Sequence, residues 1–302
     1  MSDGTSAAGR FSVTDAALLI LAAAIYGAIF PVNRFAAEAL WPPIGFAFLQ
    51  SLFAGLALLV VLVLRHEELP LRVPHLVTYL VIGGLVAGLP VGILVSAAAH
   101  LDASVLTLVL CLSPILTLLI GALAGLERFD RFTFFGMLLG TAGIALIVMP
   151  DTGIIDSDAV GWFLLALLAP VMFATANNCA KWLRPAGASS AAMAAGTLLG
   201  GAVVACAVML WFGGSMTPSS LTPGGLLPLV LATVINVVFF WLFFAIVARI
   251  GPARFSLFNY LAVAAGVLWS LAIFSERPSV LFWAALILML SGMYLALSRR
   301  AR

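Results

Sequence analysis

Amide and hydroxyl side chains are the groups best able to do chemistry inside the long apolar stretches of this sequence. The candidates are Tyr26, Tyr79, Ser113, Asn177, Asn178, Asn236, Asn259 and Tyr260, together with Asn33 and Gln50. These groups donate and accept hydrogen bonds without carrying charge. An amide facing hydrocarbon would leave its polar atoms unsatisfied, so each one must face protein or a wet cavity. Hydrogen bonding between helices and binding of a neutral or zwitterionic ligand are the two interpretations.

Charged side chains are missing from the centres of these stretches. A charge at the centre of a bilayer costs about 2.5–3.5 kcal/mol on insertion scales, so its presence there usually indicates function. Its absence disfavours a carboxylate proton relay and a strongly charged ligand. The sequence also has no HExxH motif, no aspartate-rich metal motif and no phosphate-binding glycine loop. We therefore predict no catalytic residues, no metal and no cofactor, and we do not expect an enzyme.

The remaining reactive residue types have ordinary interpretations. Cys111, Cys179 and Cys206 lie inside apolar runs without a CxxC spacing, so they are interpreted as buried thiols. The net charge is +2 and the basic residues are scattered, so nucleic acid is not an expected partner.

Four prolines interrupt apolar stretches: Pro31, Pro90, Pro114 and Pro170. Proline lacks an N–H group and strains the preceding helical turn. Each could produce a simple kink. Alternatively, the backbone groups freed at a break could meet the charged ends of a zwitterion, as broken helices do in transporters.

The elements that position these residues are predicted from composition. Hydrophobic residues make up 64% of the 302 residues and charged residues 9%, against about 25% charged in an average soluble domain. A membrane helix needs about 20 mostly apolar residues, and lipid offers no partner for backbone polar groups outside helices. The fold class is therefore an all-α membrane protein with ten transmembrane helices, at residues 13–33, 43–64, 76–98, 103–125, 132–149, 160–180, 189–212, 226–248, 253–274 and 279–297.

Positive charge orients these helices. If the N-terminus is cytoplasmic, all of the 14 Lys and Arg residues except Arg34 and Arg277 fall in cytoplasmic segments. Cytoplasmic loops of membrane proteins are enriched in Lys and Arg. We therefore expect both termini in the cytoplasm.

An internal repeat divides the chain. Glu127-Arg128 recurs 149 residues later as Glu276-Arg277, and Tyr26-Gly27 resembles Phe173-Ala174, 147 residues further on. The expected organisation is a cytoplasmic tail (1–12), a first five-helix repeat (13–150), a second repeat (151–298) and a basic tail (299–302). Because five is odd, the second copy must enter the membrane inverted, and inverted repeats are typical of secondary transporters.

These features together resemble a known family. The Tyr26-Gly27 pair, Ser113-Pro114 in the fourth helix and the two Glu-Arg pairs are similar to the EamA-type branch of the drug/metabolite transporter superfamily, with the bacterial amino-acid exporters of the YddG type the most similar. The resemblance implies export of amino acids or related metabolites across a bacterial inner membrane. It differs at Leu110-Cys111-Leu112, where aromatic-exporter relatives carry aromatic residues, which argues against a strict aromatic preference.

The resemblance and the polar residues together define an expected central substrate cavity. Its members are Tyr26, Tyr79, Pro90, Ser113, Pro114, Asn177, Asn178, Asn236, Asn259 and Tyr260. The expected partners are a small-molecule substrate and the lipid bilayer. A homodimer through the glycine face of Gly136 and Gly140 stays open, as does packing of that face within the bundle. The alternatives to a carrier working by alternating access are a facilitative pore, which would need a continuous polar path, and a membrane enzyme or scaffold.

Overall fold

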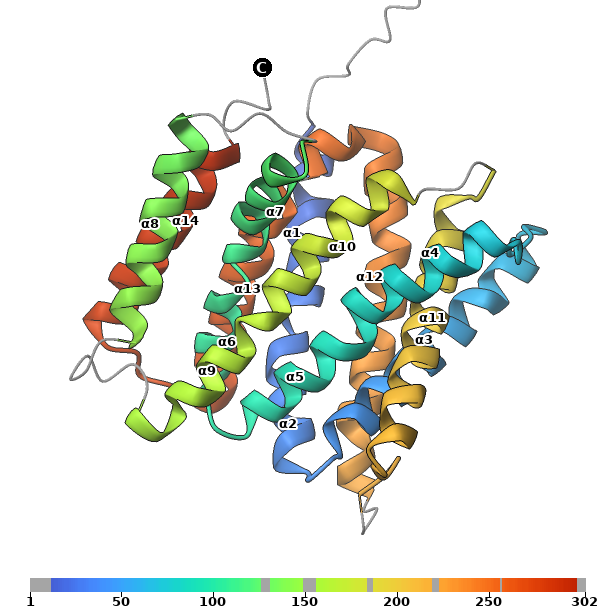
Figure 1. The fold of residues 1–302 in the computed structure, drawn as a ribbon, viewed down its shortest axis with the longest axis horizontal. Helices are drawn as coiled ribbons and strands as arrows, with labels where there is room; N and C mark the ends of the chain where they lie inside the picture. The colour runs from blue at the N-terminus through green and yellow to red at the C-terminus, as the bar shows by residue number, and fades with distance from the viewer. Residues whose placement is uncertain are drawn as a thin grey trace, which may run out of the picture.

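A computed structural model describes residues 12–125, 131–148, 156–183, 187–218, 223–255 and 257–297. Every regular element in these ranges is helical (Figure 1). The elements are α1 (Val13–Gly27), α2 (Ile29–Glu38), α3 (Pro43–Leu64), α4 (Val73–Gly83), the π-helix η1 (Gly84–Gly88), α5 (Leu89–Ala98), α6 (Ala103–Val109), α7 (Leu112–Leu123) and α8 (Arg131–Val148). They continue with the 3₁₀-helix η2 (Ser157–Ala159), α9 (Val160–Ala166), α10 (Leu168–Trp182), α11 (Ser190–Trp211), α12 (Pro223–Phe255), α13 (Leu257–Phe274) and α14 (Val280–Leu297).

Seven helical stretches in the described ranges are long and apolar enough to cross a membrane. They are Val13–Glu38, Pro43–Leu64, Val73–Ala98, Ala103–Leu123, Val160–Ala180, Ser190–Trp211 and Gly224–Phe243. Three shorter apolar helices, Phe134–Ile147, Leu261–Phe274 and Val280–Leu295, lie where the sequence predicts the other spans. All ten predicted stretches are thus helical, but only seven reach spanning length in the described residues.

The four predicted proline breaks coincide with the starts of new helices. Pro31, Pro90, Pro114 and Pro170 are each the second or third residue of α2, α5, α7 and α10. A proline is tolerated in the first helical turn because its missing N–H would have no intrahelical partner there. Each of these stretches is therefore built from two α-helices that follow one another, with the π-helix η1 between them in Val73–Ala98.

One boundary differs from the prediction. Residues 249–252 were expected to separate two spans, but α12 continues through them to Phe255. At 1.5 Å per residue, its 33 residues extend about 50 Å, beyond the roughly 30 Å hydrocarbon core. Nothing requires a helix to end at the membrane boundary, so composition alone places this end too early.

The two halves of the chain run in opposite directions. In Figure 1, α1 begins at the upper edge of the molecule, whereas α9 begins at the lower edge. Helices of the first half pack on helices of the second half. α1 contacts α13, α7 contacts α10, α8 contacts α14 and α3 contacts α11. The halves are therefore interleaved across shared contacts rather than set side by side.

Glycines permit the closest of these contacts. A Cβ atom added to Gly200 of α11 would collide with the backbone of Tyr79 in α4. A Cβ atom at Gly292 of α14 would lie 2.6 Å from the carbonyl oxygen of Gly136 in α8. The glycine face of Gly136 and Gly140 is thus used within the chain, which removes the reason for assigning it to a homodimer.

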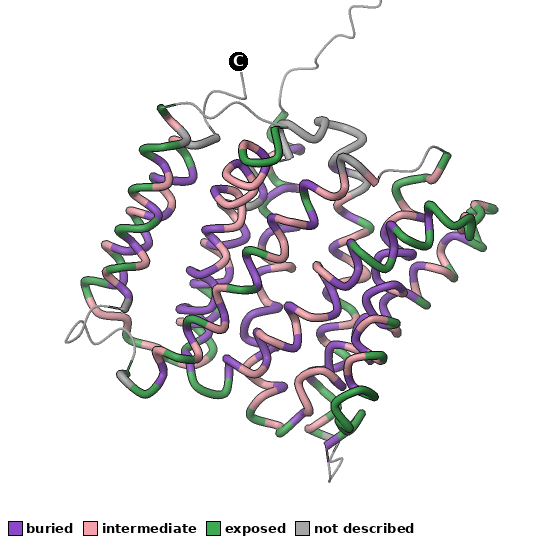
Figure 2. Tube along the Cα trace, viewed as in Figure 1, coloured by how far each residue is buried: buried purple, intermediate pink, exposed green. Residues whose placement is uncertain are grey.

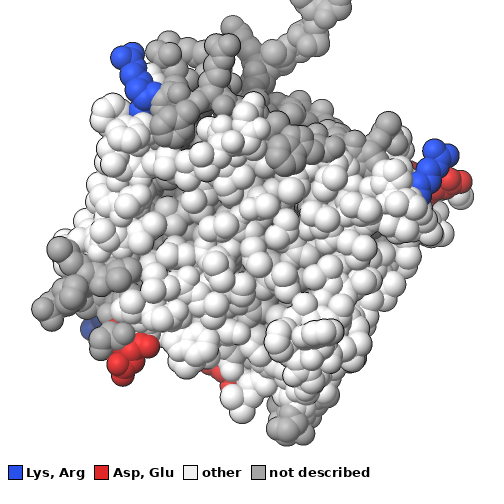
Figure 3. Space-filling view, in the orientation of Figure 1, with Lys and Arg blue, Asp and Glu red and all other residues white. Residues whose placement is uncertain are grey.

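The surface matches an apolar surrounding. Figure 2 shows buried residues on the inward helix faces and exposed ones outside, and the exposed residues include large apolar side chains such as Val60, Val203 and Trp269. Figure 3 shows a broad central area of one face without described Lys, Arg, Asp or Glu, with the charged atoms near the edges. This distribution fits a hydrocarbon belt bounded by two polar interfaces.

Candidate functional site

A cavity of about 300 Å³ lies in the middle of the bundle. Both halves of the chain form its wall: α1–α3, η1 and α5 from the first half, and α10–α12 from the second. Its size is at the small end of the range for ligand sites, which is about 300–1,000 Å³. The cavity therefore has the volume and position of a small-molecule site shared between the halves.

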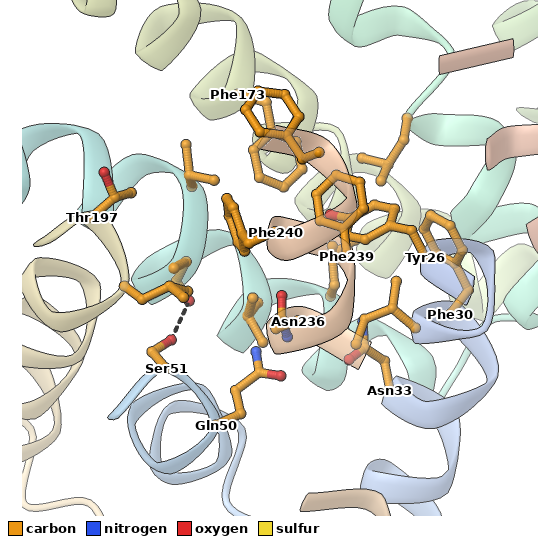
Figure 4. Close-up of a pocket in the computed structure, with 18 of the residues that line it drawn as sticks. Tyr26, Phe30, Asn33, Gln50, Ser51, Phe173, Thr197, Asn236, Phe239 and Phe240 are labelled. Carbon is orange, nitrogen blue, oxygen red and sulfur yellow. Dashed lines mark hydrogen bonds between the residues drawn. The ribbon is translucent and has the colours of Figure 1, made fainter. Parts of the chain in front are cut away.

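Amides gather at one end of this cavity. Asn33 of α2 and Gln50 of α3 line it and are each 3% exposed, and Asn236 of α12 lies beside them (Figure 4). The Nδ2 of Asn236 donates to the carbonyl oxygen of Ala232 at 2.8 Å. Within the described residues, the Oδ1 of Asn33 and the Oε1 of Gln50 are buried without a hydrogen-bond partner. Such groups cost about 1–3 kcal/mol each when left unpaired, and neither oxygen is exposed enough to meet a ligand in this conformation.

Aromatic rings line the rest of the cavity. The ring centroids of Tyr26 and Phe239 are 4.4 Å apart, and those of Phe239 and Phe240 are 5.4 Å apart. Phe173 and Phe243 complete this wall, and Figure 4 places the rings of Phe173 and Phe240 away from the amides. The cavity is consequently amphipathic, with a polar end and an aromatic end.

A π-helix forms part of the wall between these ends. In η1, the carbonyl oxygen of Ala87 accepts a hydrogen bond from the Oγ of Ser51 at 3.3 Å. Single π-turns shift the helical hydrogen-bonding register and are frequent at functional sites. Here the π-turn places Val86 and Ala87 at the cavity and supplies a backbone oxygen that a neighbouring hydroxyl satisfies.

An ion cluster lies directly beyond the polar end, one residue from Asn33. The Nη1 of Arg34 is 2.9 Å from the Oε1 of Glu276 and 3.1 Å from the Oδ1 of Asp102, and its Nε is 3.1 Å from the Oε1 of Glu38. We call these four residues the Arg34 cluster. The Glu276 carboxylate also accepts from the backbone N–H of Ala103 at 3.2 Å. The cluster joins α2 and the α5–α6 connection of the first half to the α13–α14 connection of the second.

Burial distinguishes the contacts within the cluster. The side chain of Glu276 is 6% exposed, whereas those of Asp102 and Glu38 are 54% and 52% exposed. The guanidinium of Arg34 also lies 4.2 Å from the centre of the Phe274 ring. Because ion pairs weaken with exposure, the contact between Arg34 and Glu276 is the strongest link in the cluster.

A family comparison identifies the protein class. The model of the EamA-like transporter family matches residues 15–149 and, a second time, residues 160–298. The chain belongs to the EamA-like transporter family. The predicted resemblance to this branch of the drug/metabolite transporter superfamily is thereby confirmed, as is the presence of two repeats. EamA-like proteins are multi-pass membrane transporters, so this chain is one as well.

Solved structures share this fold. One crystal structure superposes with a TM-score of 0.63 over 96% of this chain and 99% of its own, at 20% sequence identity. At this identity the likeness concerns the fold alone. No curated protein matches the sequence.

Three of the predicted site residues line the cavity of this EamA-like chain: Tyr26, Asn177 and Asn236. Their side chains come from α1, α10 and α12, so both repeats contribute. Asn259 and Tyr260 lie in α13, but their side chains are outside the described part of the structure.

The other predicted residues take structural positions in this conformation. Tyr79 is buried with its ring against Gly196, and Pro90 is buried in the first turn of α5. The Nδ2 of Asn178 donates to the carbonyl oxygens of Thr117 and Ala174, each at 3.0 Å. Ser113 and Pro114 occupy the first turn of α7 and are not among the lining residues, although the backbone N–H of Ser113 donates to the carbonyl oxygen of the lining residue Leu110 at 3.1 Å. Of the two interpretations of these amides, hydrogen bonding between helices is therefore the one that applies to Asn178.

Although Asn33 and Gln50 were among the polar candidates, the expected central cavity omitted several residues that line the cavity in the structure. They are Phe30, Asn33, Gln50, Ser51, Phe173, Thr197, Phe239, Phe240 and Phe243. A helical spacing could have identified some of them, because Tyr26, Phe30 and Asn33 fall at i, i+4 and i+7 on one face. No group of three His, Cys, Asp or Glu residues in the described ranges could hold a metal ion.

Proposed function

We propose that this EamA-like protein is a secondary transporter that exports small neutral or zwitterionic metabolites, with amino acids as the class, across a bacterial inner membrane. It works with ten transmembrane helices in a 5+5 inverted arrangement and with both termini in the cytoplasm. The observation that carries the proposal is the uncharged, amphipathic cavity enclosed between the two family repeats.

Alternating access is supported by the relation between the cavity and the Arg34 cluster. The cluster fastens the two halves together just beyond the polar end of the cavity. Two similar halves of opposite orientation can exchange conformations, so that a central site opens first to one side and then to the other. In the conformation described here, the Arg34 side is the closed one. Breaking the cluster would then accompany opening to that side.

A carrier fits these features better than a pore. A pore needs a continuous polar path, but the cavity has an aromatic wall at one end and an ion cluster closing the other. Carriers saturate and show counterflow, in which unlabelled substrate on one side accelerates entry of labelled substrate from the other. Pores show neither property.

Transport by the purified protein in proteoliposomes tests the proposal. Labelled neutral amino acids are offered with and without a pH gradient, and counterflow is measured for any that enter. The proposal predicts saturable uptake that falls at least tenfold in Asn236→Leu. Ser96→Ala is the matched control, because the Ser96 hydroxyl bonds within its own helix to Gly92 and does not line the cavity. If no amino acid moves although the protein is folded, the amino-acid assignment fails.

A further inference from the structure

We infer that Asn177 holds the substrate-free transporter in the conformation described here, because opening of the Arg34 side buries the side-chain amide of this residue. The inference rests on the proposed function of transport by alternating access. It goes further by naming a residue outside the Arg34 cluster that decides which conformation the substrate-free protein adopts.

The cavity is built from equivalent positions of the two repeats. Seven of the eight described lining residues of the second half have a lining residue at the equivalent position of the first half. Examples are Tyr26 with Phe173 and Gln50 with Thr197, each 147 residues apart, and Val91 with Phe240, 149 residues apart. These two offsets are those of the internal repeat. The two repeats therefore present the same helix faces to the cavity.

Phe30 and Asn177 are one of these equivalent pairs. Asn177 follows Phe30 by 147 residues, and both line the cavity. Their neighbours are equivalent as well, because Gly266 follows Thr117 by 149 residues. A Cβ atom added to Gly266 of α13 would lie 2.7 Å from the ring of Phe30, and the Nδ2 of Asn177 donates to the Oγ1 of Thr117 in α7 at 3.3 Å. The two side chains thus make the same contact in the two halves.

Burial differs within this pair. Phe30 lies one turn before Arg34 in α2 and is 3% exposed, whereas Asn177 is exposed. Because α10 runs against α2 (Figure 1), Asn177 faces the side opposite to the Arg34 cluster. When inverted repeats exchange conformations, equivalent positions exchange their surroundings. Opening of the Arg34 side therefore carries the amide of Asn177 into a buried position like that of Phe30 now.

Burial of this amide is unfavourable. A side-chain amide has two N–H donors and an oxygen that accepts two hydrogen bonds. The bond to Thr117 uses one donor, so burial separates the other groups from water. The typical cost of an unpaired buried polar group corresponds to a factor of about 5 to 150 in an equilibrium constant. This cost restrains the substrate-free transporter more than one whose substrate pairs with Asn177.

Two substitutions separate the amide from the size of the side chain. Asn177→Leu removes the amide, and Asn177→Gln keeps it. Spin labels on Leu40→Cys and Val280→Cys, in a background without native cysteines, report the distance across the Arg34 side. Both positions are exposed (80% and 84%) and belong to different halves.

Double electron–electron resonance on the full-length protein in detergent, without substrate, measures the population with the longer distance. We expect Asn177→Leu to raise this open population at least about fivefold. Asn177→Gln should stay within about twofold of the wild type. Ser96→Ala, outside the cavity, should match the wild type.

Glu276→Gln is the positive control, because it weakens the ion pair that joins the two halves. If Glu276→Gln opens the Arg34 side but Asn177→Leu does not, the inference fails and the proposed function stands. If neither variant changes the distance in folded protein, alternating access around the Arg34 cluster fails as well. Equal opening by Asn177→Leu and Asn177→Gln would show that side-chain size decides, and a lower open population in Asn177→Leu would show that the amide favours the open state. Either result overturns the inference.

Discussion

The ion pair between Arg34 and Glu276 should hold the Arg34 side of the transporter closed. Glu276→Gln removes one charge but keeps an oxygen that can accept from Ala103. A hydrogen bond between charged groups contributes about 1.5–3 kcal/mol when buried. Arg34 is 24% exposed and keeps two other acidic partners, so we reduce the expected loss to about 1–2 kcal/mol. Since 1.4 kcal/mol is a factor of ten, the open population should rise about 5- to 30-fold.

Glu38→Gln is the matched control for this change. It removes a carboxylate from the same guanidinium, but Glu38 lies on the same helix as Arg34 and is 52% exposed. An exposed pair at this spacing contributes about 0.3–0.5 kcal/mol. It cannot fasten one half to the other. The open population should therefore change by no more than about twofold.

Accessibility of the cavity measures the open population. A single cysteine replaces Asn236 in a background where Cys111, Cys179 and Cys206 are Ala, and a membrane-impermeant thiol reagent is added to each side in turn. Glu276→Gln should accelerate labelling from the Arg34 side 5- to 30-fold and slow it from the other side. Equal labelling rates in Glu276→Gln and Glu38→Gln would refute the assignment of this cluster as the closure.

Three further predictions concern packing, the two neighbouring amides and topology. Gly200→Ala should destabilise the protein by about 1–3 kcal/mol, because its Cβ would collide with the Tyr79 backbone. Gly161→Ala is the control: no atom lies within 4 Å of the added Cβ, so this change should not lower the thermal unfolding temperature in detergent. Asn178→Ala should lower that temperature through loss of its hydrogen bonds to Thr117 and Ala174, worth about 1 kcal/mol each. Asn177→Ala loses only an exposed hydrogen bond to the Thr117 hydroxyl, so it should change substrate affinity and leave stability nearly unaltered. The reverse pattern would contradict the placement of the two side chains. A reporter fused after Arg302 should be cytoplasmic and one inserted at Gly213 periplasmic, and finding both on one side would exclude the ten-helix topology.

The helical plan was predictable because a single physical constraint sets it. A bilayer demands stretches of about 20 apolar residues, so composition places nearly every helix. Proline chemistry then places the breaks, as Pro31 shows in the first half and Pro170 in the second. The extended end of α12 was missed because hydrophobicity reports where hydrocarbon ends and not where a helix ends.

The site was less predictable because residue type does not show which way a side chain faces. Asn177 and Asn178 are adjacent and chemically identical, and both bond to Thr117 of α7, yet Asn177 is exposed and lines the cavity whereas Asn178 is buried. About 100° of helical rotation separates them, and only the packing of α10 decides between the two. The Arg34 cluster was invisible for another reason: Glu276 lies 242 residues from Arg34, and no local pattern links them.

The antiparallel relation of the halves explains why Asn33 and Asn236 lie at the same end of the cavity. Along α1 and α2 the lining residues run from Tyr26 to Asn33, so the aromatic residue comes first and the amide later. Along α12 the order is reversed, from Asn236 to Phe243. Because α2 and α12 run in opposite directions (Figure 1), these opposite orders along the chain place the amides of Asn33 and Asn236 at the same end of the cavity. A bound ligand would therefore be oriented with its polar group toward the Arg34 cluster. Opening of that cluster would expose the polar group first, which lets water solvate the charge before the apolar body leaves the aromatic wall.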